Sequence, residues 1–304
     1  MKDNRWAMLC KLKVAAFNDP AWVWQRKLDG CRMRVDIDSR NGIGLTARSG
    51  ADKTAQFPDV VQAIALTVDW GFAPMTLDGE VVSAQGLGFQ EFNQRRMNRT
   101  EDVALMAQRL PASLVAFDVL SAWGRDMEPR SLADRLAILE RVKPACCQMP
   151  EYSNDGLYLF RKAEELGWEG VVGKRLDEPY LPGRRAWVKV KVWHEGVFDC
   201  VGYTFGTGNR EELFGALVIQ GDDGRLKAGV GSGFDRATLA SLLAFMNGRR
   251  REPMFAGGSM PALVGVRVEP FKVRVKYCEV TNDGRLRFPV YVGQADGGDA
   301  TARI

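Results

Sequence analysis

The chain of 304 residues is poor in residue types on which several enzyme classes depend. It contains one histidine, His194, so mechanisms that need several histidines are excluded, and a Ser-His-Asp triad would have to use this residue. Its six cysteines show no Cys-x-x-Cys pair and no regular spacing, which argues against a zinc site or a disulfide framework and fits a reducing cytoplasm. These cysteines are Cys10, Cys31, Cys146, Cys147, Cys200 and Cys278.

Long apolar runs and a strong excess of one charge are also absent. No run approaches membrane-spanning length, and no secretory signal follows Met1, so the sequence predicts a soluble, cytoplasmic protein. The formal net charge is only +4, which suits a nucleic-acid partner and an ordinary soluble protein equally well. The chain is 46% hydrophobic and 26% charged, an ordinary globular composition, and its length suffices for two domains with their own cores.

The hexapeptide Lys27-Leu28-Asp29-Gly30-Cys31-Arg32 combines an amine, a carboxylate, a glycine and a guanidinium. β-prone segments flank it, which predicts a strand junction with Lys27 and Asp29 on one face. Gly30 would allow a close backbone or ligand approach. A lysine among other cations and away from water loses its proton more easily, and only the neutral amine is a nucleophile. Arg32 could grip a phosphate or a ribose, although an exposed strand with ordinary charges remains the alternative.

Alternation and turns predict a mixed, largely antiparallel sheet over residues 22–82, with one helix over 58–70 packed on it. A basic helical segment over 89–109 carries Arg95, Arg96 and Arg99, for which a solvated face is favoured over a phosphate contact. Further on, the pattern predicts strands over 114–120, 171–174 and 186–191, and helices over 131–142, capped by Ser131, and 157–166, ended by Gly167.

After His194 the pattern changes to glycine-rich turns between short strands. One helix, over 236–249, interrupts them, and five-odd strands with one helix fit a small Greek-key barrel of the OB type. We therefore place a domain boundary near residue 194. The expected strands cover 198–205, 215–220, 226–230, 264–270 and 271–280.

A series of motifs follows the hexapeptide in order. They are Thr46-Ala47-Arg48-Ser49-Gly50, Leu77-Asp78-Gly79-Glu80-Val81-Val82, Phe117-Asp118, Glu169-Gly170-Val171-Val172 and Lys189-Val190-Lys191. With them the chain resembles the ATP-dependent DNA ligases, members of the covalent nucleotidyltransferase superfamily, over nearly its whole length. The resemblance implies an α+β fold. An adenylylation (nucleotidyltransferase) domain of ATP-grasp-like antiparallel sheets with flanking helices, residues 1–194, would precede an OB-fold β-barrel, residues 195–304.

The resemblance implies that Lys27 attacks the α-phosphate of ATP, expels pyrophosphate and holds AMP as a phosphoramidate. AMP would then pass to the 5′-phosphate of a nick in duplex DNA, and the 3′-hydroxyl would displace it. Each step is an in-line phosphoryl displacement, for which positioning and charge neutralisation supply most of the rate. Asp29 belongs to the same catalytic motif. Lys189 and Lys191 would neutralise the α-phosphate and help to keep the Lys27 amine uncharged.

By the same resemblance, Glu80 contacts the ribose and Glu169 a divalent metal, Mg²⁺ or Mn²⁺, which Glu80 could share. Further binding roles fall on residues that would surround the nucleotide or the nick. Phe117 would stack on adenine, Gln25 would contact the base, Arg32 would lie against the nucleotide, Arg48 would read the 5′-phosphate of the nick, and Arg285 and Arg287 are candidates for orienting pyrophosphate.

Two other readings stay open. An RNA ligase or an mRNA-capping guanylyltransferase would share the lysine chemistry, but Arg48-Ser49-Gly50 and Pro182-Gly183-Arg184-Arg185 are more typical of DNA ligases. A non-catalytic OB-type nucleic-acid-binding protein would not need the intact lysine and glutamate motifs. The short segment before Lys27 suggests the compact two-domain ligases of viruses, phages and some bacteria, which would act in the host cytoplasm if phage-encoded. We expect a monomer, and the sequence leaves replication, repair and recombination open.

Overall fold

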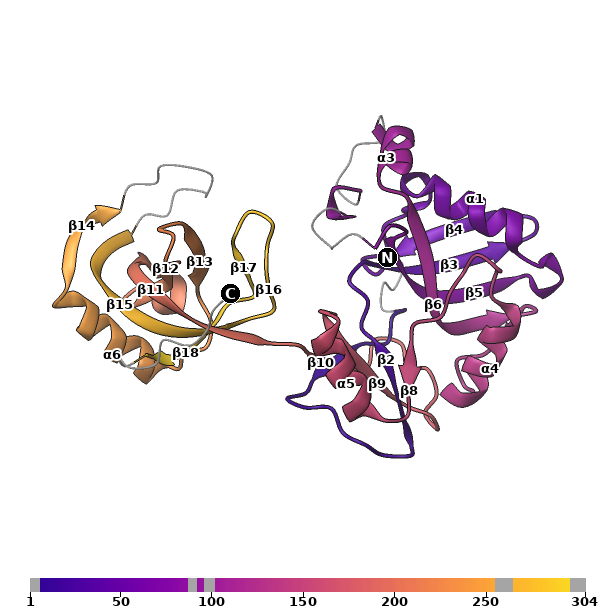
Figure 1. Cartoon of the computed structure of the whole chain (residues 1–304). Helices are drawn as coiled ribbons and strands as arrows, with labels where there is room; N and C mark the ends of the chain where they lie inside the picture. Colours follow the sequence, from indigo (N-terminus) through magenta and orange to yellow (C-terminus); the bar gives the residue numbers. More distant parts are fainter. Residues whose placement is uncertain (1–5, 87–91, 96–101, 255–264, 296–304) are drawn as a thin grey trace. The chain divides into compact units, whose positions relative to one another are not determined.

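The computed structural model describes residues 6–86, 92–95, 102–254 and 265–295. The chain divides into two compact units, Met1–Val192 and Trp193–Ile304, which are described separately (Figure 1). Strands predominate in both, and helices flank the sheets, so the mixed α+β fold predicted from the sequence is confirmed. Among the described residues, no helix is long and apolar enough to cross a membrane.

Within the described part of the first unit there are two sheets of five strands each. One has the order β1-β10-β9-β2-β8 and is antiparallel except for β1 beside β10. The other is the antiparallel sheet β4-β3-β5-β6-β7. The strands are β1 (Cys10–Leu12), β2 (Trp22–Arg26), β3 (Cys31–Asp38), β4 (Gly42–Ala47), β5 (Met75–Ser83), β6 (Ala112–Ala122), β7 (Arg125–Asp126), β8 (Tyr152–Ser153), β9 (Gly170–Arg175) and β10 (Trp187–Lys191).

The period-two pattern of β3 shows how these sheets separate core from site. Its apolar positions, from Cys31 to Ile37, are buried, while the alternating charged residues are half-buried on the other face. The buried face packs against α1 (Pro58–Thr67) and α4 (Leu132–Val142) in one apolar core. The opposite face is therefore available for polar chemistry.

The helices of the first unit begin where the sequence provides suitable residues. Pro58 occupies the first turn of α1, and the Ser131 side chain accepts a hydrogen bond from the backbone N–H of Asp134 at the start of α4, as predicted. α5 (Gly156–Glu165) is capped by Asp155 and packs on the first sheet around Trp24 and Leu159. Further helical segments are η1 (Thr54–Gln56), η2 (Trp70–Phe72) and α3 (Val103–Arg109).

The prediction for the basic segment over 89–109 was wrong for Arg95. Its side chain is only 1% exposed, forms an ion pair with Asp59 of α1, and lies 5.3 Å from the ring centroid of Phe57. Helical spacing indicates which residues share a face, but it does not reveal that a distant helix supplies a carboxylate. Arg96 and Arg99 lie outside the described residues.

The second unit contains a sheet of six described strands in the order β13-β12-β11-β15-β14, with β18 on the other part of β15. Helix α6 (Arg236–Asn247) follows β13 and begins at the predicted residue, capped by Asp235. The strands are β11 (His194–Phe205), β12 (Phe214–Gln220), β13 (Leu226–Val230), β14 (Arg250–Met254), β15 (Gly265–Tyr277) and β18 (Val290–Gln294); β16 (Glu279–Val280) pairs with β17 (Leu286–Arg287).

The two strands predicted over 264–270 and 271–280 are one continuous strand, β15. The pairing of β15 with β11 shifts register between Phe271 and Arg267, so Pro270 lies at an irregular step where its missing N–H breaks no regular ladder bond. The sequence analysis treated this proline as a strand end. It also missed β14, which pairs with the first part of β15.

Candidate active site

The hexapeptide lies at the junction of the two sheets of the first unit, as predicted. β2 ends at Arg26, β3 begins at Cys31, and residues 27–30 form the connection, so strand alternation does not place Lys27 and Asp29 on one face. The Lys27 backbone N–H donates to the Gly170 carbonyl at 2.9 Å. A Cβ on Gly30 would lie 2.3 Å from the Val81 carbonyl oxygen, which explains the glycine.

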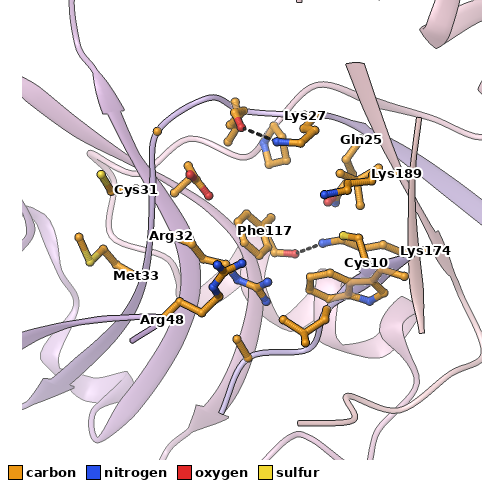
Figure 2. A pocket seen from close by; sticks show the side chains of 18 of the residues that line it. Cys10, Gln25, Lys27, Cys31, Arg32, Met33, Arg48, Phe117, Lys174 and Lys189 are labelled. Carbon is orange, nitrogen blue, oxygen red and sulfur yellow. Dashed lines mark hydrogen bonds between the residues drawn. The ribbon is translucent and has the colours of Figure 1, made fainter. Parts of the chain in front are cut away.

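A cavity of about 1000 Å³ opens beside Lys27, between the two sheets (Figure 2). The first sheet contributes Cys10, Gln25, Val172, Lys174, Trp187 and Lys189 to its lining; the second contributes Arg32, Ala47, Glu80 and Phe117. The cavity is thus lined by basic, apolar and few acidic groups. This composition suits a ligand with an apolar ring at one end and negative charge at the other.

Lys27 is held by a carboxylate from the other end of the domain sequence. Its Nζ donates to Glu169 Oε2, and the Nζ of Lys191 lies 3.3 Å from Glu169 Oε1. Burial lowers the pKa of Lys27, but the charge and hydrogen bond of Glu169, with Glu80 and Asp29 nearby, outweigh it, so the net pKa is raised. The expectation that surrounding cations keep this amine uncharged was therefore wrong for the ligand-free protein.

Glu80 differs from Glu169 in its surroundings. Its half-buried side chain lines the cavity. Among the described residues, the Glu80 carboxylate accepts no hydrogen bond and forms no ion pair. Burial raises the pKa of Glu80 to about 7, while the Lys27 and Arg32 charges oppose the rise. In Glu169 the neighbouring Lys27 and Lys191 charges outweigh burial and lower the pKa of the carboxyl. The two carboxylates therefore differ in proton affinity.

The cavity lining contains a buried polar atom without a partner among the described residues. Gln25 is 2% exposed, and its Nε2 has no hydrogen-bond acceptor within the described residues. Gln25 pairs in register with Val172, and Phe117 also lines the cavity. A buried donor without a partner costs about 1–3 kcal/mol. Gln25 and Phe117 thus fit a flat ring that carries a hydrogen-bond acceptor.

The sequence analysis did not single out Lys174. Its side chain is 2% exposed and lines the cavity, with Nζ donating to the Phe117 carbonyl at 3.2 Å and lying 4.1 Å from the Trp187 ring centroid (Figure 2). Burial lowers the pKa of Lys174 to about 8. Val172 and Lys174 are two residues apart on β9 and so share a face, a signal that could have identified Lys174.

Arg32 points into the cavity wall, but protein groups hold most of its donors. Its Nε and Nη2 donate to the two Asp78 carboxylate oxygens at 2.9 and 2.6 Å, and Nη1 donates to the Met8 carbonyl at 2.7 Å. Tyr180 donates to the same Asp78 carboxylate at 2.8 Å. The planar fork that the sequence suggested for phosphate or ribose is thus engaged by Asp78.

Exposed cations lie at another part of the cavity lining. Arg48 and Ser49 follow β4, Lys53 follows shortly after, and Arg185 precedes β10. Arg48 and Arg185 are exposed, and Lys53 donates to Gln56 Oε1 at 2.7 Å. The loop with Arg48 and the segment with Arg185 are far apart in sequence, and the fold brings both to one cavity. Such a group of basic side chains suits a phosphate.

Not every predicted site residue lines the cavity. Asp29, Glu169 and Lys191 are outside its lining, although Glu169 and Lys191 contact or approach Lys27 through the ion pairs above. Arg285 and Arg287 belong to the second unit, where they pair with Asp283 at 3.0 Å and Glu279 at 3.2 Å. Their role toward pyrophosphate remains a prediction.

A half-buried lysine thus lines a cavity of about 1000 Å³ together with several further cations, an arrangement that suits a phosphate-bearing ligand. The family model for the ATP dependent DNA ligase domain matches residues 7–191, and the chain belongs to this family. The family predicted from the motifs is thereby confirmed.

Among curated proteins, the chain is 34% identical over 285 residues to the multifunctional non-homologous end joining DNA repair protein LigD of Mycobacterium tuberculosis, covering 90% of this chain and 36% of that protein. It thus spans little more than a third of this relative. It is 30% identical over 269 residues to DNA ligase C1 of Mycolicibacterium smegmatis, covering 83% of this chain and 74% of that protein.

Solved structures show the same relationship. The ligase domain from M. tuberculosis LigD is 27% identical, with a TM-score of 0.53, covering 97% of this chain and 96% of that domain. A mycobacterial DNA ligase D complexed with ATP and MES is 26% identical, with a TM-score of 0.54, covering 98% and 97%. A Lig E DNA ligase, 18% identical with a TM-score of 0.65, covers 95% and 99% and is similar in fold.

Proposed function

We propose that this chain seals nicks in duplex DNA, using ATP, through an adenylyl group carried on Lys27. The observation that carries the proposal is the position of Lys27. Its side chain lines the cavity and donates a hydrogen bond to Glu169, Lys189 lines the same cavity, and Lys191 pairs with the same Glu169 carboxylate. The Gln25 amide, whose Nε2 has no acceptor among the described residues, and the Phe117 ring in the same cavity lining support ATP as the nucleotide, because adenine offers acceptors and a flat face.

In the first step, the Lys27 nitrogen bonds to the α-phosphorus and the bond to pyrophosphate breaks. Lys27 must first lose a proton from Nζ, and the Glu169 carboxylate opposes this loss until its negative charge is neutralised. Lys189 stabilises the negative charge that develops on the phosphate, and Arg32 adds positive charge from the wall. The fixed positions of these groups supply most of the acceleration.

In the later steps, the adenylyl group moves from Lys27 to the 5′-phosphate of the nick, and the 3′-hydroxyl then displaces AMP. Arg48, with Lys53 and Arg185 in the same cavity lining, supplies the positive charge that a 5′-phosphate requires. The second unit, which we propose to be an OB-fold barrel, carries Arg285 and Arg287, which we propose as candidates for orienting the pyrophosphate that leaves in the first step.

We also propose that Glu80 and Glu169 hold a divalent metal, Mg²⁺ or Mn²⁺. No cluster of three or more histidine, cysteine or acidic residues occurs among the described residues, which fits Mg²⁺ because this ion binds through one or two carboxylates and waters. Glu80, with its raised pKa and without a partner, is a carboxylate that a cation would complete. When bound, the metal neutralises phosphate charge.

The relatives named for non-homologous end joining favour DNA repair over replication as the setting. Nicked duplex DNA is the proposed partner, and a monomer in the cytoplasm remains the expectation from the sequence. RNA ligation and capping are the alternatives that the substrate comparison below distinguishes.

The deciding experiment incubates the protein with α-labelled ATP and Mg²⁺. The wild type should retain covalently bound label that resists alkali and is released by acid, as expected of a phosphoramidate. Lys27→Ala should retain none, since the proposed nucleophilic amine is missing. Lys53→Ala serves as a control that keeps the nucleophile. The protein should then join nicked DNA faster than nicked RNA, and it should not transfer the nucleotide to RNA ends as a capping enzyme would. Undiminished labelling of Lys27→Ala, or a preference for RNA, contradicts the proposal.

A further inference from the structure

Two adjacent cysteines, Cys146 and Cys147, lie side by side on the loop after α4. Their Sγ atoms are 3.8 Å apart. Cys147 is 1% exposed within the core of the second sheet, whereas Cys146 is half-buried at its edge. The thiols thus form a pair with one reachable member and one buried member, and the proposed ligation reaction uses neither.

The loop holds the pair in place through backbone hydrogen bonds. Cys146 N–H donates to Thr67 Oγ1 at 3.3 Å, and Cys147 N–H donates to the Pro144 carbonyl at 2.9 Å. Directly after the pair, the Gln148 carbonyl accepts from Ala116 N–H of β6 at 2.8 Å. Backbone hydrogen bonds before and after the pair therefore hold the loop, and with it the two sulfur atoms, in place.

This spacing suits one bridging atom better than a disulfide. Two sulfurs bonded to one atom at about 2.3 Å each, with an angle between the bonds of about 90–110°, are about 3.3–3.8 Å apart. A disulfide needs sulfurs about 2.05 Å apart and Cα atoms about 4.4 Å or more apart, whereas consecutive Cα atoms are only about 3.8 Å apart across a trans peptide. The peptide bond between Cys146 and Cys147 thus opposes the disulfide, while a bridge requires little movement.

Among the described residues, no third histidine, cysteine or acidic ligand joins the pair. Across the residues that the structure describes, no group of three or more histidine, cysteine or acidic side chains could hold a metal ion. A ligand must therefore bring its remaining substituent with it. Monosubstituted trivalent arsenic has this chemistry, with two exchangeable positions and one carbon substituent on a thiophilic atom.

We propose that Cys146 and Cys147 form a dithiol site that takes one monosubstituted trivalent arsenical as a cyclic bis-thiolate. Cys146 sulfur bonds to arsenic first, and Cys147 sulfur bonds next. The two thiol protons and the arsenic-bound oxygen leave as water, so two As–S bonds replace the arsenic–oxygen bonds and no atom changes oxidation state. Because the second step is intramolecular, the buried Cys147 needs no access from solvent.

The electrostatics of the pair agree with this order. The contact with Cys147 lowers the pKa of Cys146, and the same contact, with burial, raises the pKa of Cys147. Cys146 is therefore the more acidic of the two thiols, and the thiolate is the nucleophile.

The test treats the full chain with phenylarsine oxide, washes it with a monothiol and measures intact mass. We expect the mass of the chain to increase by one phenylarsenic group and to decrease by the two thiol hydrogens. This adduct should resist the monothiol and be removed by a dithiol. Cys146→Ser and Cys147→Ala should each lose this adduct, while Cys278→Ser, a control at another half-buried cysteine, should keep it. Circular dichroism checks that each variant is folded.

Three results would overturn the proposal. The adduct could persist in Cys146→Ser, the wild type could gain no arsenic, or the wild type could lose only two hydrogens because a disulfide forms. Lys27→Ala should form the adduct like the wild type, so the result is separate from that of the labelling experiment.

Discussion

The ion pair between Asp118 and Arg135 should contribute more to stability than any surface pair of this chain with the same geometry. Asp118 follows Phe117 in β6 and is fully buried, as is Arg135 of α4. Arg135 Nε donates to Asp118 Oδ1 at 2.7 Å and Nη2 donates to Oδ2 at 3.1 Å. Arg135 Nη1 also donates to the Arg130 and Glu178 carbonyls.

Replacing Asp118 by alanine leaves the Arg135 guanidinium buried with only its backbone partners. Breaking a buried pair from one side costs about 3–5 kcal/mol, because an uncompensated charge remains. The matched control is Asp177→Ala, which removes a two-bond pair with Arg175 at 2.7 and 3.0 Å whose side chains are 62% and 41% exposed. Exposed pairs contribute about 0–1 kcal/mol.

Urea unfolding followed by tryptophan fluorescence measures both variants. Seven of the eight tryptophans lie in residues 1–192 and only Trp193 lies beyond, so the signal reports chiefly on the first unit. The double variant Asp118→Ala/Arg135→Met should lose less stability than Asp118→Ala, because no charge is left unpaired. If Asp118→Ala costs no more than Asp177→Ala, the buried pair does not have the role assigned here.

Three further predictions concern the cavity. Arg48→Ala should still self-adenylylate but join nicks about 10- to 100-fold more slowly, the loss of one charged hydrogen bond, and loss of labelling would contradict its role at the nick. Gln25→Ala should need about 2- to 10-fold more ATP for half-maximal labelling, and an unchanged requirement would exclude the base contact. Since the pKa of Lys174 is lowered to about 8 in the folded protein, the unfolded chain binds more protons between about pH 8 and 10.5. The free energy of unfolding of the wild type should therefore rise over that range, relative to that of Lys174→Met, by up to about 3 kcal/mol. If urea unfolding shows the same change between pH 7 and pH 10 for both proteins, this reasoning is refuted.

Local signals in the sequence predicted the strand junction at Lys27, the Ser131 cap and the strand around Phe117, because each depends on neighbours in the chain. The partners of Lys27 and Arg95 could not be predicted from local patterns. Glu169 and Asp59 reach these side chains only after distant segments pack together. Motif order indicated that Glu169 belongs to the site, but not that it holds the nucleophile as a cation.

Pro270 illustrates the opposite error, in which a local rule is applied too strictly. Proline usually ends a strand, yet an irregular step in the β11–β15 pairing accommodates it. Lys174 was missed for another reason: a lysine in an apolar strand looks like an exposed residue until the fold places Phe117 and Trp187 over it.

The ion pair between Lys27 and Glu169 also bears on the reactivity of this side chain. A protonated amine does not attack electrophiles such as aldehydes and cyanate, and the raised pKa of Lys27 favours the ammonium form. If Lys27 carries the adenylyl group as proposed, it becomes a nucleophile only when another partner takes up the Glu169 charge or the proton. The same carboxylate would then limit irreversible modification of this lysine during the intervals between substrates.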